Sequence, residues 1–192
     1  MSMPSQRPAT EADLAALWAL RTRAVRSGCA SHYPPEVIDT WSAASPPATM
    51  PLLVRAGGGI VAEDAGRLLG YAVLDAETGE DDAVFVDPGA HGQGIGRALL
   101  AALEAMARAQ DLDRLFLSAS LNAVPFYQRA GFRALRERLV AHRSGIAMRA
   151  LQMEKRLTPS GCTAPCPPPS PSTGPAPAAR SRACPLPPAP SF

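Results

Sequence analysis

The chain has 192 residues, a formal net charge of +2 and a hydrophobic fraction of 46%. This length is enough for one domain with a substantial core, and the small net charge argues against nucleic acid or an anionic membrane as a partner. Because no long apolar run occurs and residues 1–10 lack the apolar core of a signal peptide, we expect a cytoplasmic protein without a membrane span.

The composition changes sharply near Thr158. Twelve of the 21 prolines lie between Pro159 and Pro190, mixed with Ser, Ala and Gly. Such a segment cannot bury enough apolar surface to offset the entropy that it would lose on ordering. We therefore predict one folded domain over residues 1–157 and a disordered, proline-rich tail over residues 158–192.

The four cysteines do not suggest a disulfide framework. Cys29 falls in the predicted domain, whereas Cys162, Cys166 and Cys184 fall in the tail. The spacing of Cys162 and Cys166 could suggest zinc, but no histidine or second cysteine pair accompanies it. We expect no metal site.

The first part of the predicted domain is typical of helices separated by proline-rich breaks. Thr10 suits a helix N-cap, with Asp13 as its capping-box partner, and apolar residues at helical spacing follow. Pro34-Pro35-Glu36 predicts the start of a second helix. The prolines between positions 46 and 51 predict a loop.

The second part of the predicted domain alternates strands and helices. Turn residues separate three strands, and two strand–helix units and a final strand pair follow. The expected elements are strands over 60–63, 67–75 and 80–86, a helix over 96–109, a strand over 112–118, a short helix capped by Asn122 and ended by Gly131, and strands over 132–142 and 147–157. The sum is an α/β fold in which helices cover a sheet.

The stretch from Val84 to Arg97 combines an apolar strand end, a proline turn, a glycine-rich corner and a helix start. It places free backbone N–H groups, a helix N-terminus and a cation around one point, which suits a pyrophosphate. The glycines do not match the dinucleotide or P-loop patterns, because Arg97 or Leu99 replaces the third glycine and no lysine follows. A tight turn explains one or two of these glycines, but less easily three at alternate positions.

His91-Gly92-Gln93-Gly94-Ile95-Gly96 resembles the acyl-CoA pyrophosphate loop of the GCN5-related N-acetyltransferases (GNAT), whose pattern is Q/R-x-x-G-x-G/A. Residues 122–132 are similar to that family's second signature, and residues 84–88 and 153–157 resemble its fourth and last strands. The resemblance covers about residues 5–157. It implies a GNAT-type acyl-CoA N-acyltransferase fold, with a mixed, mostly antiparallel sheet, a central V-shaped splay and flanking helices.

The resemblance also implies acetyl-CoA as a co-substrate. Backbone N–H groups near Phe85 and Val86 would face the thioester, and Asn122 would contact the pantetheine or a bound water. The residues implied for CoA binding are Val84, Phe85, Val86, His91, Gly92, Gln93, Gly94, Ile95, Gly96, Arg97 and Asn122. His91 stands where the family usually has Gln or Arg. We hypothesise that it helps to hold a phosphate, so that CoA binding weakens as the imidazole loses its proton with rising pH; the alternative is a solvent-facing loop histidine.

Acyl transfer to an amine requires that the amine lose a proton and that the leaving thiolate gain one. Tyr127 matches the family's tyrosine in the second signature and is the candidate acid; the alternative is a packing aromatic. Two carboxylates compete as the base. Glu80 lies eleven residues before His91, where the family often has its catalytic glutamate, and Asp82 is two residues further on, hence expected on the same strand face. The alternative is a solvated acidic turn.

His32, Tyr33 and Trp41 fall in the region that forms one wall of the acceptor site in such enzymes, although ordinary packing explains them equally, and Ser118 and Ser120 are expected in the same cleft. We expect acetyl transfer to a primary amine of a small molecule or protein by direct attack, since no cysteine is expected near the cleft. The alternative is a non-catalytic acyl-CoA-binding or regulatory module on the same fold. A monomer or homodimer is expected, with no nucleic acid or membrane partner.

Overall fold

The computed structural model describes residues 4–141 and 145–157, apart from the side chains of Asp81 and Asp82. The predicted tail and its three cysteines lie outside the described residues. Among the described residues, no helix combines the length and apolar character needed to cross a membrane. The elements are, in chain order, β1 (Ser5–Pro8), η1 (Glu11–Asp13), α1 (Leu14–Gly28), α2 (Pro35–Ala43), α3 (Met50–Arg55), β2 (Gly59–Asp64), β3 (Arg67–Asp75), β4 (Glu80–Val86), η2 (Pro88–Ala90), α4 (Ile95–Ala109), β5 (Arg114–Ser120), α5 (Val124–Arg129), β6 (Arg133–Ala141) and β7 (Ala147–Arg156).

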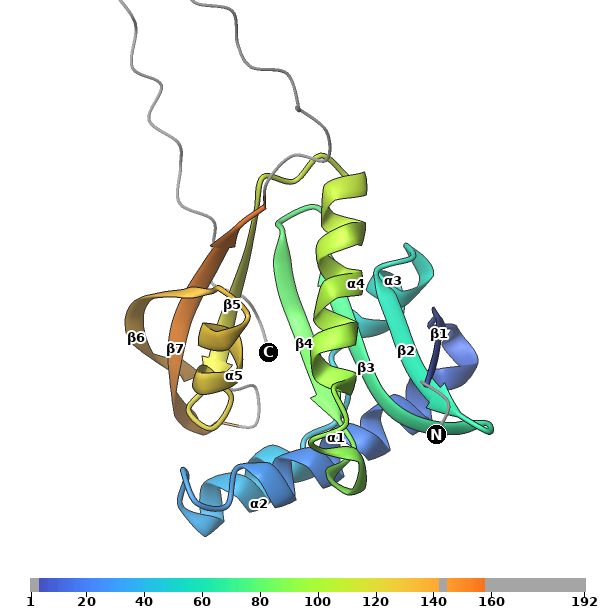
Figure 1. The fold of residues 1–192 in the computed structure, drawn as a ribbon. Coiled ribbons are helices and arrows are strands. Elements are labelled where there is room, and N and C mark those ends of the chain that lie inside the picture. Colours follow the sequence, from blue (N-terminus) through green and yellow to red (C-terminus); the bar gives the residue numbers. More distant parts are fainter. Residues whose placement is uncertain (1–3, 142–144, 158–192) are drawn as a thin grey trace, which may run out of the picture.

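The strands form one sheet in the order β1-β2-β3-β4-β5-β7-β6 (Figure 1). Every neighbouring pair is antiparallel except β4 and β5, which are parallel and are joined through α4. Within the described part of the chain, β4 and β5 pair at one position, Glu80 with Phe116. Figure 1 shows the two strands side by side where β4 begins and far apart where it ends. The predicted mixed sheet with a central V-shaped splay is confirmed.

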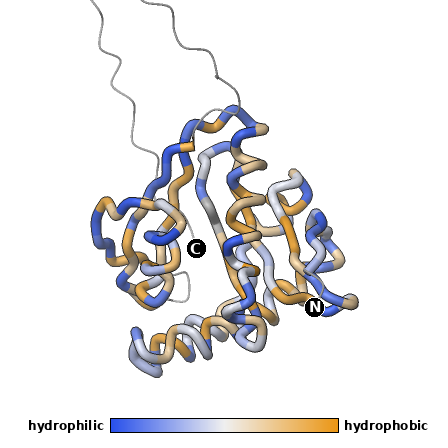
Figure 2. Tube along the Cα trace, viewed as in Figure 1, coloured by the Kyte–Doolittle hydropathy of each residue, from blue (hydrophilic) through white to orange (hydrophobic). Residues whose placement is uncertain are grey.

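Strand alternation divides the core into two layers. Val84 and Val86 of β4 pack with the α4 side of the sheet, where Leu99 is buried. Ala83 and Phe85 pack with the opposite layer, formed by α1 and α3. Figure 2 shows β4 changing from hydrophilic at its first residues to hydrophobic at its end. The acidic start of β4 therefore lies at the closed end of the V, and its apolar half lines the open end.

The predicted bounds of β3 and β4 are confirmed, but two short elements were not expected. Helix α3 begins at Met50 in the segment predicted as a loop, and Pro51 is tolerated in its first turn because the N–H that proline lacks has no helical partner there. Strand β1 has four mostly exposed residues at the sheet edge, so it carries no alternating apolar pattern. Strand β5 begins at Arg114 and ends at Ser120, two residues later at each end than predicted.

The predicted cap of the short helix is wrong. Helix α5 begins at Val124 after Ala123, and no side chain caps it. The side chain of Asn122 turns instead to α1, where its Oδ1 lies 3.3 Å from the Sγ of Cys29 and accepts the thiol hydrogen. The other end is as predicted, because Gly131 adopts φ +92°, a conformation that glycine adopts without strain.

Candidate active site

Residues 91–94 form an exposed loop, and residues 95–97 form the first turn of α4, where Ile95 is buried. Gly92 and Gly94 both have φ +78°, and a Cβ added at either would meet no atom within 4 Å. The first backbone hydrogen bond of the helix runs from Ala98 N to Gly94 O at 3.0 Å. Among the described residues, no acceptor is bonded to the N–H groups of positions 92–97. Six consecutive N–H groups at the start of α4 therefore have no acceptor among the described residues, and such unpaired donors at a helix N-terminus suit a phosphate.

The end of β4 directs its peptide groups into the splay. Asp87 N donates to Leu69 O of β3 at 2.8 Å, and N–H directions alternate along an antiparallel strand. The N–H of Phe85 therefore faces β3, whereas those of Val84 and Val86 face the gap between β4 and β5. This corrects the expectation for Phe85, whose backbone N–H is directed into the sheet.

His91 closes the turn between β4 and the loop. Its Nε2 lies 3.2 Å from the carbonyl oxygen of Val86, which can only accept, so Nε2 donates this hydrogen bond. The ring lies back against the strand end, although the side chain as a whole remains exposed. Its predicted contact with a phosphate stays a prediction.

Asp87 anchors the turn to α1 and β3. Its carboxylate accepts from Arg23 Nη2 at 2.7 Å, from Gly89 N at 3.0 Å and from Arg67 Nη2 at 3.4 Å. The hydrogen bonds from Arg23 hold the pKa of this buried carboxyl below its usual value. The turn before the loop is thus attached to helix α1 and to strand β3.

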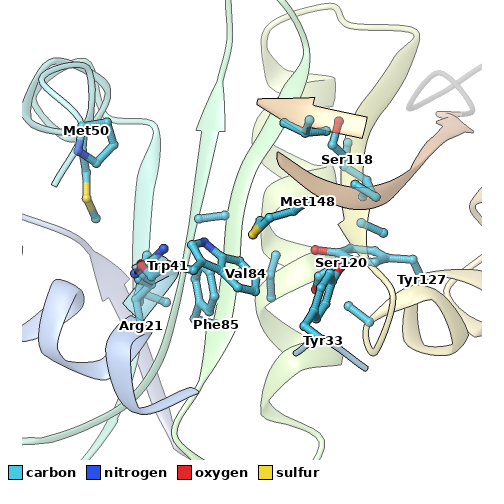
Figure 3. Close-up of a pocket in the computed structure, with 18 of the residues that line it drawn as sticks. Arg21, Tyr33, Trp41, Met50, Val84, Phe85, Ser118, Ser120, Tyr127 and Met148 are labelled. Carbon is cyan, nitrogen blue, oxygen red and sulfur yellow. Dashed lines mark hydrogen bonds between the residues drawn. The ribbon is translucent and has the colours of Figure 1, made fainter. Parts of the chain in front are cut away.

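A cavity opens where β4 and β5 diverge and extends to α1, α2 and α3 (Figure 3). Its walls come from widely separated segments, and most of its surface is apolar. The predicted residues that line it are Tyr33, Trp41, Val84, Phe85, Ser118, Ser120 and Tyr127. His32 is exposed and does not line it. Asn122 is adjacent through Ala123 but is not part of the wall, so its predicted role toward CoA stays untested.

Tyr127 lies in this wall at the side of β5 and α5. It is 7% exposed and packs edge-to-face against Phe126 and Phe132, with ring centroids 5.0 and 5.4 Å away. The packing holds the ring in one place, and the phenol is in contact with the cavity. The packing role and the predicted acid role are therefore compatible.

Tyr33, in the segment between α1 and α2, is bonded to the β5 and β7 side of the open end. Its hydroxyl donates to Arg149 O of β7 at 2.7 Å and accepts from Leu121 N, after β5, at 2.9 Å. Burial raises the pKa of this phenol above its usual value, so it stays protonated near neutral pH. Its hydrogen bonds give it a structural role in the cavity wall.

Sequence analysis missed the charged residue of the cavity. Arg21 lies on α1 and is 3% exposed. It falls at helical spacing between Leu17 and Val25, which are both buried, and a cation in an apolar stripe is a signal that could have been noticed. Trp18, Met50 and Met148 also line the cavity without having been predicted.

The two candidate bases, Glu80 and Asp82, both lie in the first half of β4. Glu80 pairs with Phe116 at the closed end of the V and is not in the cavity wall. The register with β3 shifts between Ala83 and Asp81, so Asp82 is an extra residue in a β-bulge. The bulge interrupts the strand alternation on which the expected shared face of Glu80 and Asp82 rested, so that expectation stays a prediction.

The expectation that no cysteine lies near the cleft is also wrong. Cys29 contacts Asn122, directly beside the cavity wall. Burial raises the pKa of its thiol to about 11, so it is protonated at neutral pH and is a poor nucleophile.

The model of the acetyltransferase (GNAT) domain matches residues 29–157 of this chain. The chain belongs to the GNAT acetyltransferase family. A GCN5-related N-acetyltransferase from Rhodopseudomonas palustris is similar in structure, with a TM-score of 0.73 and 28% identity over 82% of this chain and 98% of that one. The PaiA N-acetyltransferase of Thermoplasma acidophilum, solved with coenzyme A, shares the fold, with a TM-score of 0.61 and 18% identity over 81% of this chain and 99% of that one.

A curated relative of this GNAT chain is the glucosamine 6-phosphate N-acetyltransferase of Trypanosoma brucei brucei. The two are 32% identical over 81 residues, which are 38% of this chain and 55% of the relative. The match thus spans about half the length of that protein.

Proposed function

We propose that this GNAT protein transfers an acetyl group from acetyl-CoA to a primary amine of a small molecule or protein by direct attack. One observation carries the proposal. The six backbone N–H groups of residues 92–97, without acceptors in the described residues, lie next to a splay into which the peptide groups of Val84 and Val86 point. The family and its neighbours, one of them solved with coenzyme A, support this assignment.

The residues fit the diphosphate of CoA. Backbone donors, a helix N-terminus and the exposed Arg97 occur together at the start of α4, beside the open space at Gly92 and Gly94. A Cβ at Gly96 would make ordinary van der Waals contacts, 3.4 Å from the Phe126 ring and 3.5 Å from Val86, so the start of α4 lies directly against β4 and α5. When bound, acetyl-CoA supplies an acetyl group activated as a thioester.

The protein's own groups would act on the charges that develop. The N–H groups of Val84 and Val86 can donate to carbonyl oxygens placed in the gap, including one that gains negative charge during attack. Tyr127 can donate its phenolic proton to the departing thiolate sulfur. The protonated Cys29 is not suited to form an acyl-enzyme, which favours direct attack.

The base remains a choice between Glu80 and Asp82, acting directly or through water. A general base works in its deprotonated form, so kcat/KM rises with pH as the base loses its proton. We expect this rise to disappear in either Glu80→Gln or Asp82→Asn, but not in both. If both variants keep the rise, neither carboxylate is the base.

The deciding experiment is thiol release from acetyl-CoA across a panel of primary amines, with acetyl-CoA hydrolysis in the absence of amine as the background. We expect release above background with at least one amine. Tight CoA binding without turnover on any amine would instead support a non-catalytic acyl-CoA-binding module. Failure to bind CoA at all would overturn both functions.

A further inference from the structure

The part of the cavity that faces α1 and α2 has one distinctive feature. Among the described residues that line the cavity, Arg21 is the only one with a charged side chain. The surrounding wall is aromatic or apolar and includes Trp18, Trp41 and Met50. A guanidinium remains positively charged at any physiological pH. The cavity therefore combines an apolar body with a fixed positive charge.

Arg21 is held in place by its neighbours. Its Nη1 donates to the carbonyl oxygen of Trp41 at 2.7 Å. Its Cζ lies 4.5 Å from the ring centroid of Trp18 and 5.4 Å from that of Trp41, which are cation–π distances. Figure 3 shows Arg21 beside Trp41 on the side of the cavity opposite Tyr127. A side chain ordered in this way loses little further entropy when it binds a ligand.

A guanidinium in such a setting is suited to an oxyanion. Its five N–H donors lie in one plane and match the two oxygens of a carboxylate or phosphate. Charge-assisted hydrogen bonds are strong where water is excluded. The aromatic wall around it would pack against an apolar ligand body.

The position of Arg21 separates it from the CoA loop. Residues 91–97 lead into α4 and form its first turn, and α4 packs on one face of the sheet, whereas α1 packs on the other face. The splay between β4 and β5 is the opening between the two faces. A ligand held at Arg21 would therefore reach the gap from the side opposite to the diphosphate loop.

We propose, building on the N-acetyltransferase function above, that the acceptor is an amine that carries an oxyanion on the same molecule, next to an apolar or aromatic body, and that Arg21 binds this oxyanion. The chemistry is shared by aromatic amino acids and by amines that bear a phosphate. Arg21 is then a specificity-determining residue for the acceptor.

The first test compares matched acceptors in the wild type and in Arg21→Gln. The pairs are L-phenylalanine with L-phenylalaninamide, and tyramine O-phosphate with tyramine, so that a carboxylate and a phosphate, each on an aromatic amine, are assayed separately. We expect the preference for the charged member of one pair to fall about 10- to 100-fold in the variant, the loss typical of one charge-assisted hydrogen-bonded contact. The ratio between the two enzymes cancels the different intrinsic reactivities of the amines.

Two further variants make this comparison specific. Arg26→Gln removes an exposed arginine from the same helix, outside the cavity, and should keep the wild-type preference. Arg21→Lys keeps the charge without the planar donors and should give an intermediate preference; it carries the test if Arg21→Gln does not fold, which acetyl-CoA binding will show. A preference in neither pair, or one unchanged in both Arg21 variants, would overturn the proposal.

A second readout needs no turnover. The two tryptophans of the chain, Trp18 and Trp41, both lie against Arg21, so intrinsic fluorescence reports on this site. We expect either N-acetyl-L-phenylalanine or N-acetyltyramine O-phosphate to change the fluorescence saturably, with affinity reduced in Arg21→Gln, and the counterpart without the oxyanion to bind more weakly. Oxyanion binding without acetylation of any amine would support the site and contradict the enzymatic function. Amine acetylation without any oxyanion preference would support the enzymatic function and contradict the proposed site at Arg21.

Discussion

The two ends of the proposed site, the loop at residues 91–97 outside the cavity and the part of the cavity near Arg21, are built to hold ligands by different means. The loop at residues 91–97 offers backbone N–H groups from one continuous segment, and its side chains are mostly exposed. The end near Arg21 offers side chains from α1, α2 and α3, which are distant in sequence from β4 and β5. The first end should therefore be sensitive to backbone conformation, and the second to side-chain chemistry.

The largest effect expected at the backbone end follows from Gly94→Val. A β-branched residue at φ +78° costs about 1–3 kcal/mol in strain, and its side chain would occupy the open space beside the N–H groups. We expect the Kd for CoA to rise about 100-fold or more by calorimetry, which is about 2.7 kcal/mol. The matched control is Gly57→Val, which has φ +82° and similar open space at the end of α3. An unchanged Kd in Gly94→Val would contradict the loop's assigned role.

A side-chain effect is expected next, from Tyr127→Phe. Removing the phenolic proton donor should lower kcat about 10- to 1000-fold, as for one acid–base group, while CoA still binds. The comparison variant is Tyr33→Phe, which removes another hydroxyl of the wall and leaves Leu121 N unpaired. It should cost about 1–3 kcal/mol in the free energy of unfolding and reduce kcat much less. Equal kcat values for wild type and Tyr127→Phe would remove the acid role.

A smaller effect, on stability, is expected from Asp87→Asn. It weakens the bonds from Arg23 and Arg67 that hold the base of the loop, which should cost about 1–2 kcal/mol in urea unfolding. Because folding lowers the pKa of Asp87, its stabilisation is present above about pH 4, the ordinary value of an unfolded aspartate, and is lost as pH falls through the folded value.

The difference in the free energy of unfolding between wild type and Asp87→Asn should therefore become smaller as the pH falls. Asp113→Asn is the control, since Asp113 is exposed and pairs with the neighbouring Arg114 at the surface, where ion pairs contribute little. A difference that grows toward low pH would contradict this account of Asp87.

The smallest effect is expected from Cys29→Ala. With the pKa of the thiol raised to about 11, almost no thiolate forms at neutral pH. We expect an unchanged kcat, with no burst of thiol release before steady state. A complete loss of turnover, with CoA binding retained, would instead indicate an acyl-enzyme on Cys29 and contradict direct attack.

The chain order of the strands and the glycine-rich loop with its helix start could be predicted from the sequence for local reasons. The bounds of β3 and β4 follow from turns at Asp64-Ala65-Gly66 and Thr78-Gly79. The loop at 91–97 needs only glycines, a helix start and an arginine in one stretch. A site made from the backbone of consecutive residues can be recognised in the local sequence, because all of its groups lie in one segment.

Tertiary structure alone decided which side chains meet. Three features depend on contacts between segments distant in sequence. They are the bulge at Asp82, the hydrogen bond between Asn122 and Cys29, and the position of Arg21 against two tryptophans. Periodicity reports which face a residue occupies but not what the opposite element brings to it. The part of the cavity near Arg21 is assembled from such long-range contacts. Its residues could therefore be identified only from the tertiary structure, in which α1 packs against the sheet.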